Sequence, residues 1–145
     1  MASAFPRLDT TSLAGRRLRL PGDLDRPTVL ILAFERHQQT EVDDWIEELE
    51  AAGCPHPIME VPTIGTRYRF FRPLIDGGMR SGIPDAAVRA RTLTAYTDVG
   101  RVLGALGLRS TRHVVVALVE PSGDVRALAQ GVFEPAAAAP FLEGD

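Results

Sequence analysis

Residues with reactive side chains are few in this chain, and they lie far apart in the sequence. Cys54 is the only cysteine, so the chain can form neither an internal disulfide nor a CxxC redox pair. Cys54 follows an expected helix, beside Gly53 and Pro55, where the negative end of the helix dipole disfavours a thiolate. We therefore expect an unreactive thiol. A one-cysteine peroxidase acting through Cys54 is kept as an alternative hypothesis.

The histidines do not have the spacing of a metal site. His37, His56 and His113 form no HxH or HxxxH pattern, so we expect no metal ligands and no cofactor. His37 follows an apolar run, and a solvated loop histidine is the simplest interpretation. The alternative is an enzyme that uses a non-cysteine group near His37. The sequence also lacks a nucleophile elbow, a dinucleotide glycine motif and a phosphate loop. All 16 basic residues are arginines, so no lysine is available for a Schiff base or a phosphate loop.

Basic and aromatic side chains alternate in the middle of the chain, between residues 66 and 91. Arginine and aromatic residues dominate the hot spots of protein interfaces. The candidate binding residues are Arg67, Tyr68, Arg69, Phe70, Phe71, Arg72 and Arg80. We expect this segment to bind an unknown protein partner or a second copy of the chain. The alternative is that Phe70, Phe71 and Leu74 fill the core, and that the arginines are solvated or pair with acids of the preceding helix.

Bulk composition narrows the classes of function. The net charge of -3 gives no general attraction to nucleic acid or to an anionic membrane. The first ten residues have no apolar segment typical of a signal peptide, and no run is long enough to span a bilayer. We expect a cytoplasmic protein with one domain over residues 1–145, although a domain cut from a longer exported protein would look the same.

The apolar pattern predicts the elements that position these side chains. Residues 28–34 and 114–119 are continuous apolar runs, typical of strands buried on both faces of a sheet. Between them, apolar residues spaced by three and four predict a helix over residues 41–52, with Thr40 as its N-cap and Gly53 at its end. Trp45 belongs to the apolar face of that helix, so we expect it to pack against the sheet.

Shorter patterns predict the remaining elements. The expected strands are an edge strand or hairpin at 12–21, a strand at 57–64 that Pro62 restricts to an edge or to its last residues, a strand at 91–97 and a hairpin ending near 129. The expected helices are one that kinks or starts at Pro73 and is stopped by Gly77 and Gly78, and one from Pro84 to 91. A helix capped by Asp98 and a short C-terminal helix complete the prediction. This order predicts an α/β fold with a mixed sheet.

Four segments resemble the peroxiredoxin branch (alkyl hydroperoxide reductase and thiol-specific antioxidant proteins) of the thioredoxin-like superfamily. They are FPRLDTTSLAGRRLRLP, TVLILAF, YTDVGRVLGALGL and VVVALVEPSGDV. The resemblance implies a thioredoxin-like fold: a central mixed β-sheet flanked by helices, with a terminal β-hairpin. In that family the nucleophilic cysteine lies just after the first core strand, near the start of the next helix. Residues 34–45, FERHQQTEVDDW, contain no cysteine, so His37, Gln38, Gln39 and Thr40 form a vestigial active-site loop.

A second resemblance is to a cysteine-poor group, the assembly factors of mitochondrial ATP synthase and their bacterial relatives. It rests on Trp45, the segment MRSGIP and the segment TRHVVVALVEPSGDVRALAQG. TRHV also lacks the cis-proline that thioredoxins carry before the hairpin strand. This resemblance implies a non-enzymatic role in binding or assembling proteins. We therefore expect a non-catalytic thioredoxin-like binding module.

Overall fold

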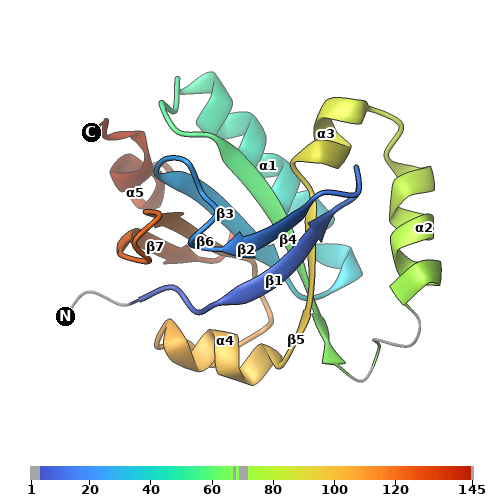
Figure 1. The fold of residues 1–145 in the computed structure, drawn as a ribbon. Coiled ribbons are helices and arrows are strands. Elements are labelled where there is room, and N and C mark those ends of the chain that lie inside the picture. The colour runs from blue at the N-terminus through green and yellow to red at the C-terminus, as the bar shows by residue number, and fades with distance from the viewer. Residues whose placement is uncertain (1–3, 67, 69–71, 145) are drawn as a thin grey trace.

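Seven strands form one mixed sheet in the part of the chain that the computed structural model describes, residues 4–66, 68 and 72–144 (Figure 1). The sheet order is β2-β1-β5-β4-β3-β6-β7. The central strands β3, β4 and β5 are parallel, and the outer pairs are antiparallel. The strands are β1 (Leu8–Ser12), β2 (Arg17–Leu20), β3 (Thr28–Ala33), β4 (Ile58–Gly65), β5 (Leu93–Thr97), β6 (Val115–Val119) and β7 (Val125–Gln130). The α/β class, the mixed sheet and the terminal hairpin are confirmed.

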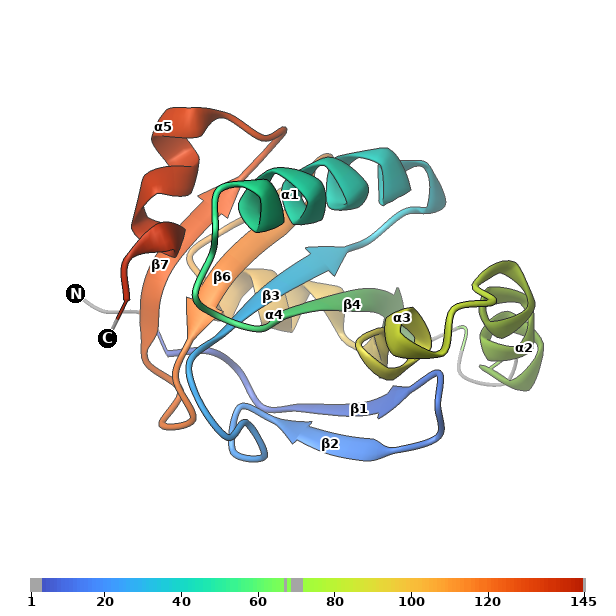
Figure 2. The same cartoon turned by 90° about the horizontal axis from the view of Figure 1, so that it is seen from above.

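Helices cover both faces of the sheet (Figure 2). α1 and α5 lie on one face and α4 lies on the other, while α2 lies to one side of the sheet. The helices are α1 (Gln39–Ala51), α2 (Arg72–Gly82), α3 (Ala86–Ala90), α4 (Val99–Ala105) and α5 (Pro135–Ala138), with 3-10 turns at Arg36–Gln38 and Ala139–Leu142. None of the helices in the described part of the chain has the length and apolarity that crossing a membrane requires.

Strand β3 shows why the apolar run at 28–34 is unbroken. Val29 and Ile31 pack with the core under α1, whereas Leu30 and Leu32 pack with the core under α4. Because successive side chains of a strand point to opposite faces, a strand between two helical layers needs apolar residues at every position. Trp45 of α1 is fully buried in the first of these cores, as expected.

The start of α1 differs from the expectation. Thr40 is not the N-cap, because the helix begins at Gln39 and a 3-10 turn, Arg36–Gln38, precedes it. Glu35 begins that turn and forms a reciprocal capping box with Gln38. The end of α1 is as expected: Gly53 has φ +76°, and the amides of Gly53 and Cys54 bond to the last helical carbonyls.

Strand β4 also corrects an expectation. We expected Pro62 to confine its strand to an edge or to the last residues, but β4 lies inside the sheet between β3 and β5. Pro62 lies opposite Ala33, the last pair between β3 and β4, and the pairing with β5 begins at Thr63. The missing amide therefore falls where one ladder ends, which is why an interior strand tolerates this proline.

The segment after β4 contains two further corrections. Gly77 and Gly78 do not stop α2, which begins at Arg72 and continues to Gly82. Pro84 does not lie in the first turn of α3, because Asp85 is the N-cap and its side chain accepts from the amides of Ala87 and Val88 at 2.8 and 3.3 Å. Asp98 caps α4 as expected, accepting from the amide of Arg101 at 3.2 Å.

Candidate functional site

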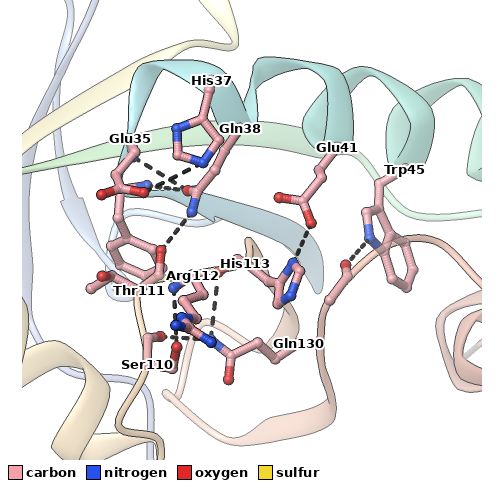
Figure 3. Close-up of polar contacts among 12 residues, drawn as sticks. Glu35, His37, Gln38, Glu41, Trp45, Ser110, Thr111, Arg112, His113 and Gln130 are labelled. Atoms are coloured by element: carbon pink, nitrogen blue, oxygen red, sulfur yellow. Dashed lines mark hydrogen bonds and ion pairs between the residues drawn. The ribbon is translucent and has the colours of Figure 1, made fainter.

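The candidate site lies where β3 ends and α1 begins, at the carboxyl end of the three parallel strands. Ligand sites of open α/β sheets lie at this edge. Residues 37–40, which the sequence predicts to be a vestigial active-site loop, lie here, in the 3-10 turn and the first turn of α1 (Figure 3). The loop before β6, residues 110–113, lies against it, and side-chain contacts join the two loops.

Gln38 is the central residue of this site, and it is fully buried. Its Oε1 accepts hydrogen bonds from the backbone amides of Phe34 at 2.8 Å and Glu35 at 3.3 Å. Its Nε2 donates to the carbonyl oxygen of Thr111 at 2.5 Å (Figure 3). One carboxamide therefore closes the loop after β3 and ties it to the loop before β6.

Glu41 and His113 make a second contact between the same two segments. Glu41 Oε1 lies 2.7 Å from His113 Nδ1, and the glutamate side chain is only 15% exposed. Gln130, the last residue of β7, also holds the loop before β6, because its Nε2 donates to the carbonyl of Ser110 at 2.7 Å. The sequence analysis did not place His113 or Glu41 in the site. The only signal was that His113 belongs to TRHV, the segment before β6, where thioredoxins carry a cis-proline.

The other residues of the vestigial loop point outward. His37 is exposed, and in the described part of the chain its ring contacts the carboxylate of Glu35 at 3.5 Å. Gln39 donates to Asp43 at 2.9 Å, and Thr40 is exposed. Of the four expected loop residues, only Gln38 points into the protein. Among the described residues, the contact of the His37 ring is thus with a carboxylate of the same loop.

Cys54 is remote from this loop, at the opposite end of α1. The helix has 13 residues, which corresponds to about 20 Å between its ends. The thiol is half-buried, and its Sγ lies 3.4 Å from the carbonyl of Phe141 and 3.7 Å from that of His56. His56 is itself buried, with its Nε2 2.7 Å from the carbonyl oxygen of Glu143. Cys54 and His56 therefore fasten the end of α1 to the C-terminal segment and do not belong to the candidate site.

A pocket of about 510 Å³ opens beside the Gln38 loop, on the side of α4. It lies at the carboxyl ends of β3, β4 and β5. Its charged lining residues among those described are Glu35 and Asp98, and Phe34 and Tyr68 supply aromatic rings. The full lining is Phe34, Glu35, Thr63, Gly65, Thr66, Tyr68, Thr97, Asp98, Val99, Gly100 and Thr111.

A second, smaller pocket of about 420 Å³ lies between α1 and α3, and the buried carboxyl group of Glu60 lines it. Burial raises the pKa of Glu60, and the negative charge of Asp43 raises it further. A hydrogen bond from Gln39 and the charge of Arg91 act in the opposite direction. Arg91 lies 4.0 Å from Glu50. One arginine of the 66–91 segment thus pairs with an acid of α1, as the alternative interpretation of that segment expected.

The expected binding residues of the 66–91 segment are described only in part. Arg67, Arg69, Phe70 and Phe71 lie outside the described residues. Arg72 is the first residue of α2. Tyr68 is 41% exposed, and Arg80 Nε donates to the carbonyl of Leu13 at 3.0 Å. Leu74, which the alternative interpretation placed in the core, is 76% exposed, so that part of the alternative is wrong. Whether this segment binds a partner stays a prediction.

Comparison with known proteins identifies the fold. The chain matches no protein-family profile and no curated protein sequence. Solved structures resemble it over most of its length. The pneumococcal exposed lipoprotein thioredoxin Etrx1 from Streptococcus pneumoniae aligns with a TM-score of 0.61 and 16% identity, covering 94% of this chain and 98% of that one. A thio-disulfide isomerase from Thermus thermophilus aligns at 0.55 and 15%, covering 95% and 91%.

A third similar structure is BsSco, described as a member of the Sco family of cytochrome c oxidase assembly proteins. It aligns with a TM-score of 0.58 and 11% identity, covering 97% of this chain and 91% of that one. At these identities the likeness shows the fold, and the chain has the thioredoxin-like fold. It does not show the peroxiredoxin branch or the ATP synthase assembly group. The expected cytoplasmic location also stays a prediction.

Proposed function

We propose that this chain is a non-catalytic thioredoxin-like module that binds proteins and acts in assembly. The observation that carries the proposal is the position and bonding of Gln38. In the families that the sequence resembles, the reactive thiol lies just after the first core strand, near the start of the next helix. Gln38 directly precedes α1, and its amide is fully buried and bonded to three backbone groups. A carboxamide is neither a thiol nucleophile nor a redox group, and here it acts as a cross-link.

The 66–91 segment is the surface through which we propose binding. Tyr68 and Leu74 are both exposed large side chains, and α2 lies to one side of the sheet. Exposed apolar and aromatic groups beside arginines have the composition of interface hot spots. The resemblance to assembly factors of mitochondrial ATP synthase, and the description of BsSco as an assembly protein, support an assembly role.

The enzymatic alternatives receive less support from the geometry. A non-cysteine enzyme near His37 would need a nucleophile or a bound substrate next to an exposed ring that contacts Glu35. A one-cysteine peroxidase would have to use Cys54, which lies at the end of α1 distant from the parallel-strand edge. In this proposal the chain therefore shares the fold of the peroxiredoxins and does not share their thiol chemistry.

Two measurements test the proposed function. The purified protein should reduce insulin disulfides and consume peroxide no faster than serum albumin. Turnover of about 1 per second or faster would contradict a non-catalytic role. Binding is tested by affinity capture from cells of the source organism, followed by identification of the captured proteins by mass spectrometry.

Matched variants locate the binding surface. Leu74→Ser and the double charge reversal Arg69→Glu/Arg72→Glu should release captured partners or dissociate a self-associated species. Val132→Ser is the control for the first variant, because Val132 is also a large exposed side chain, at 57%. Arg16→Glu/Arg17→Glu, in the β1–β2 hairpin, is the control for the second. If the 66–91 variants keep every partner and the same oligomeric state, that segment is structural.

A further inference from the structure

The pocket beside the Gln38 loop has the size of a ligand site. Its volume of about 510 Å³ lies within the range of about 300–1,000 Å³ that small-molecule and side-chain pockets occupy. It lies at the carboxyl edge of three parallel strands, the usual place for binding in an open α/β sheet. Gln38 closes one wall by holding Phe34 and Glu35 against the loop that carries Thr111.

The charge of this pocket is negative. Glu35 and Asp98 come from different elements, and they are the ionisable acids among the described lining residues. Both also cap a helical turn, Glu35 before the turn Arg36–Gln38 and Asp98 before α4. The start of a helix carries about half a positive charge, which offsets only part of a full carboxylate charge.

Among the described residues, no cationic side chain lines this pocket. His37 contacts Glu35 at 3.5 Å from the exposed side of the loop. Arg101 donates to the carbonyl of Arg7 and to the hydroxyl of Thr97, both at 3.0 Å, and is not a lining residue. The described lining residues therefore include two carboxylates and no cation, and a negative charge remains for a ligand.

The other walls suit a planar cation. Phe34 and Tyr68 present aromatic rings, and a guanidinium is attracted to the face of such a ring. The hydroxyl of Thr63 donates its hydrogen to the carbonyl of Val61, so towards a ligand the hydroxyl oxygen can only accept. A guanidinium has five N–H donors and no acceptor, and it bonds in parallel to a carboxylate. Carboxylates, hydroxyl acceptors and aromatic rings together complement that group.

We propose that this pocket binds the guanidinium group of an arginine side chain presented by a partner polypeptide. The inference rests on the proposed protein-binding function and identifies a second contact of the module, which shares Tyr68 with the 66–91 segment and takes its charge from Glu35 and Asp98. The carboxylates of Glu35 and Asp98 bind the guanidinium, and the rings of Phe34 and Tyr68 contact its planar faces.

The test is an NMR titration of the full isotope-labelled chain with the peptide acetyl-Gly-Gly-Arg-Gly-Gly-amide. We expect saturable shifts at the backbone amides of Thr63, Thr97 and Gly100. The same peptide with citrulline in place of arginine keeps the shape and loses the charge. It should bind at least about five-fold more weakly, which is the expected effect of removing one charge contact.

Variants of the two acids identify the contact. Glu35→Gln/Asp98→Asn keeps oxygen acceptors for both helix caps, and it should weaken the arginine peptide at least about five-fold. Asp44→Asn/Glu48→Gln makes the same change of net charge on the exposed side of α1 and should leave affinity unchanged.

Three outcomes would overturn the proposal. The citrulline peptide could bind as tightly as the arginine peptide, or the control variant Asp44→Asn/Glu48→Gln could lose as much affinity as Glu35→Gln/Asp98→Asn. The third is that the amide shifts show no saturation up to about 20 mM arginine peptide. The last of these would leave partner capture through the 66–91 segment untouched. Failure of this inference and failure of the proposed function are therefore distinguishable.

Discussion

The side-chain amide of Gln38 and the carbonyl of Thr111 are joined by a 2.5 Å hydrogen bond across 73 residues of sequence. The bond links the loop that follows β3 to the loop that precedes β6, at the edge of the sheet where related folds carry out redox chemistry. A buried amide that bonds three backbone groups stabilises this edge.

Replacing Gln38 with alanine should destabilise the fold by about 1–3 kcal/mol, because buried amide and carbonyl groups of the two loops lose their partner. Urea unfolding followed by circular dichroism measures the change. Thr40→Ala is the control, since Thr40 lies in the same first turn of α1 and its side chain is exposed. Equal stability of the two variants would contradict the cross-linking role of Gln38.

Replacing Trp45 with alanine should cost about 3–5 kcal/mol. Its ring is fully buried and lies edge-on to Phe133 and Phe141, with centroid distances of 5.2 and 5.8 Å. Its Nε1 also donates to the carbonyl of Gly131 at 2.9 Å. Trp45→Phe keeps an aromatic ring and should lose less. If Trp45→Ala melts at the wild-type temperature, the packing of α1 on the sheet is wrong.

The stability of the protein should fall as pH rises through the pKa of Glu60 in the folded state. Burial raises that pKa above 4.5, and the charge of Asp43 raises it further, so the folded state binds the proton more tightly than the unfolded state. The contribution of Glu60 is therefore fully present below about pH 4.5 and is lost above it. Glu60→Gln removes this loss and should become increasingly more stable than wild type as pH rises.

Urea midpoints measured from pH 4 to pH 8 test this dependence, with Glu48→Gln as a control at an exposed position of α1. The difference between wild type and Glu60→Gln should grow with pH and then level off. A difference that is the same at every pH would show that the carboxyl group titrates normally in the folded protein.

Alanine should have opposite effects at two kinds of glycine. An added Cβ at Gly77 or Gly78 meets no atom within 4 Å, so Gly77→Ala and Gly78→Ala should stabilise α2 by about 0.5–1 kcal/mol each. Gly53 has φ +76° at the end of α1, and Gly53→Ala should destabilise the protein by about 1 kcal/mol or more. Amide hydrogen exchange in α2 and urea unfolding measure the two effects. Destabilisation by Gly77→Ala or Gly78→Ala would indicate a close contact at α2 that the isolated chain does not contain.

Elements determined by local pattern were predictable from the sequence. The apolar runs of β3 and β6 and the cap at Asp98 follow from rules that span a few residues. Helix α2 was not predictable past Gly77, because its position depends on distant contacts: Tyr96 donates to Asp76 at 2.8 Å, and Arg80 bonds to Leu13. The interior position of β4 depends on pairing with β3 and β5, which the local effect of Pro62 does not reveal.

The location of the candidate site was predictable from the sequence, but the side-chain contacts that form it were not. The missing cysteine and the loop after β3 were visible in the sequence, and so was the lack of proline before β6. The role of Gln38 was not visible, because glutamine has no catalytic motif and its partner Thr111 lies 73 residues away. The pairing of Glu41 with His113 is equally non-local, with 72 residues between them.

Both ends of α1 are fastened to the last part of the chain, and this affects when the helix reaches its native place. Gln38 bonds to Thr111, Trp45 to Gly131, Cys54 to Phe141 and His56 to Glu143. On a ribosome, these partners emerge about 70–90 residues after the helix, which takes roughly 4–18 s at usual synthesis rates. During that interval the apolar side of α1 has only an incomplete sheet to pack against, so its final docking follows the emergence of residues 111–143.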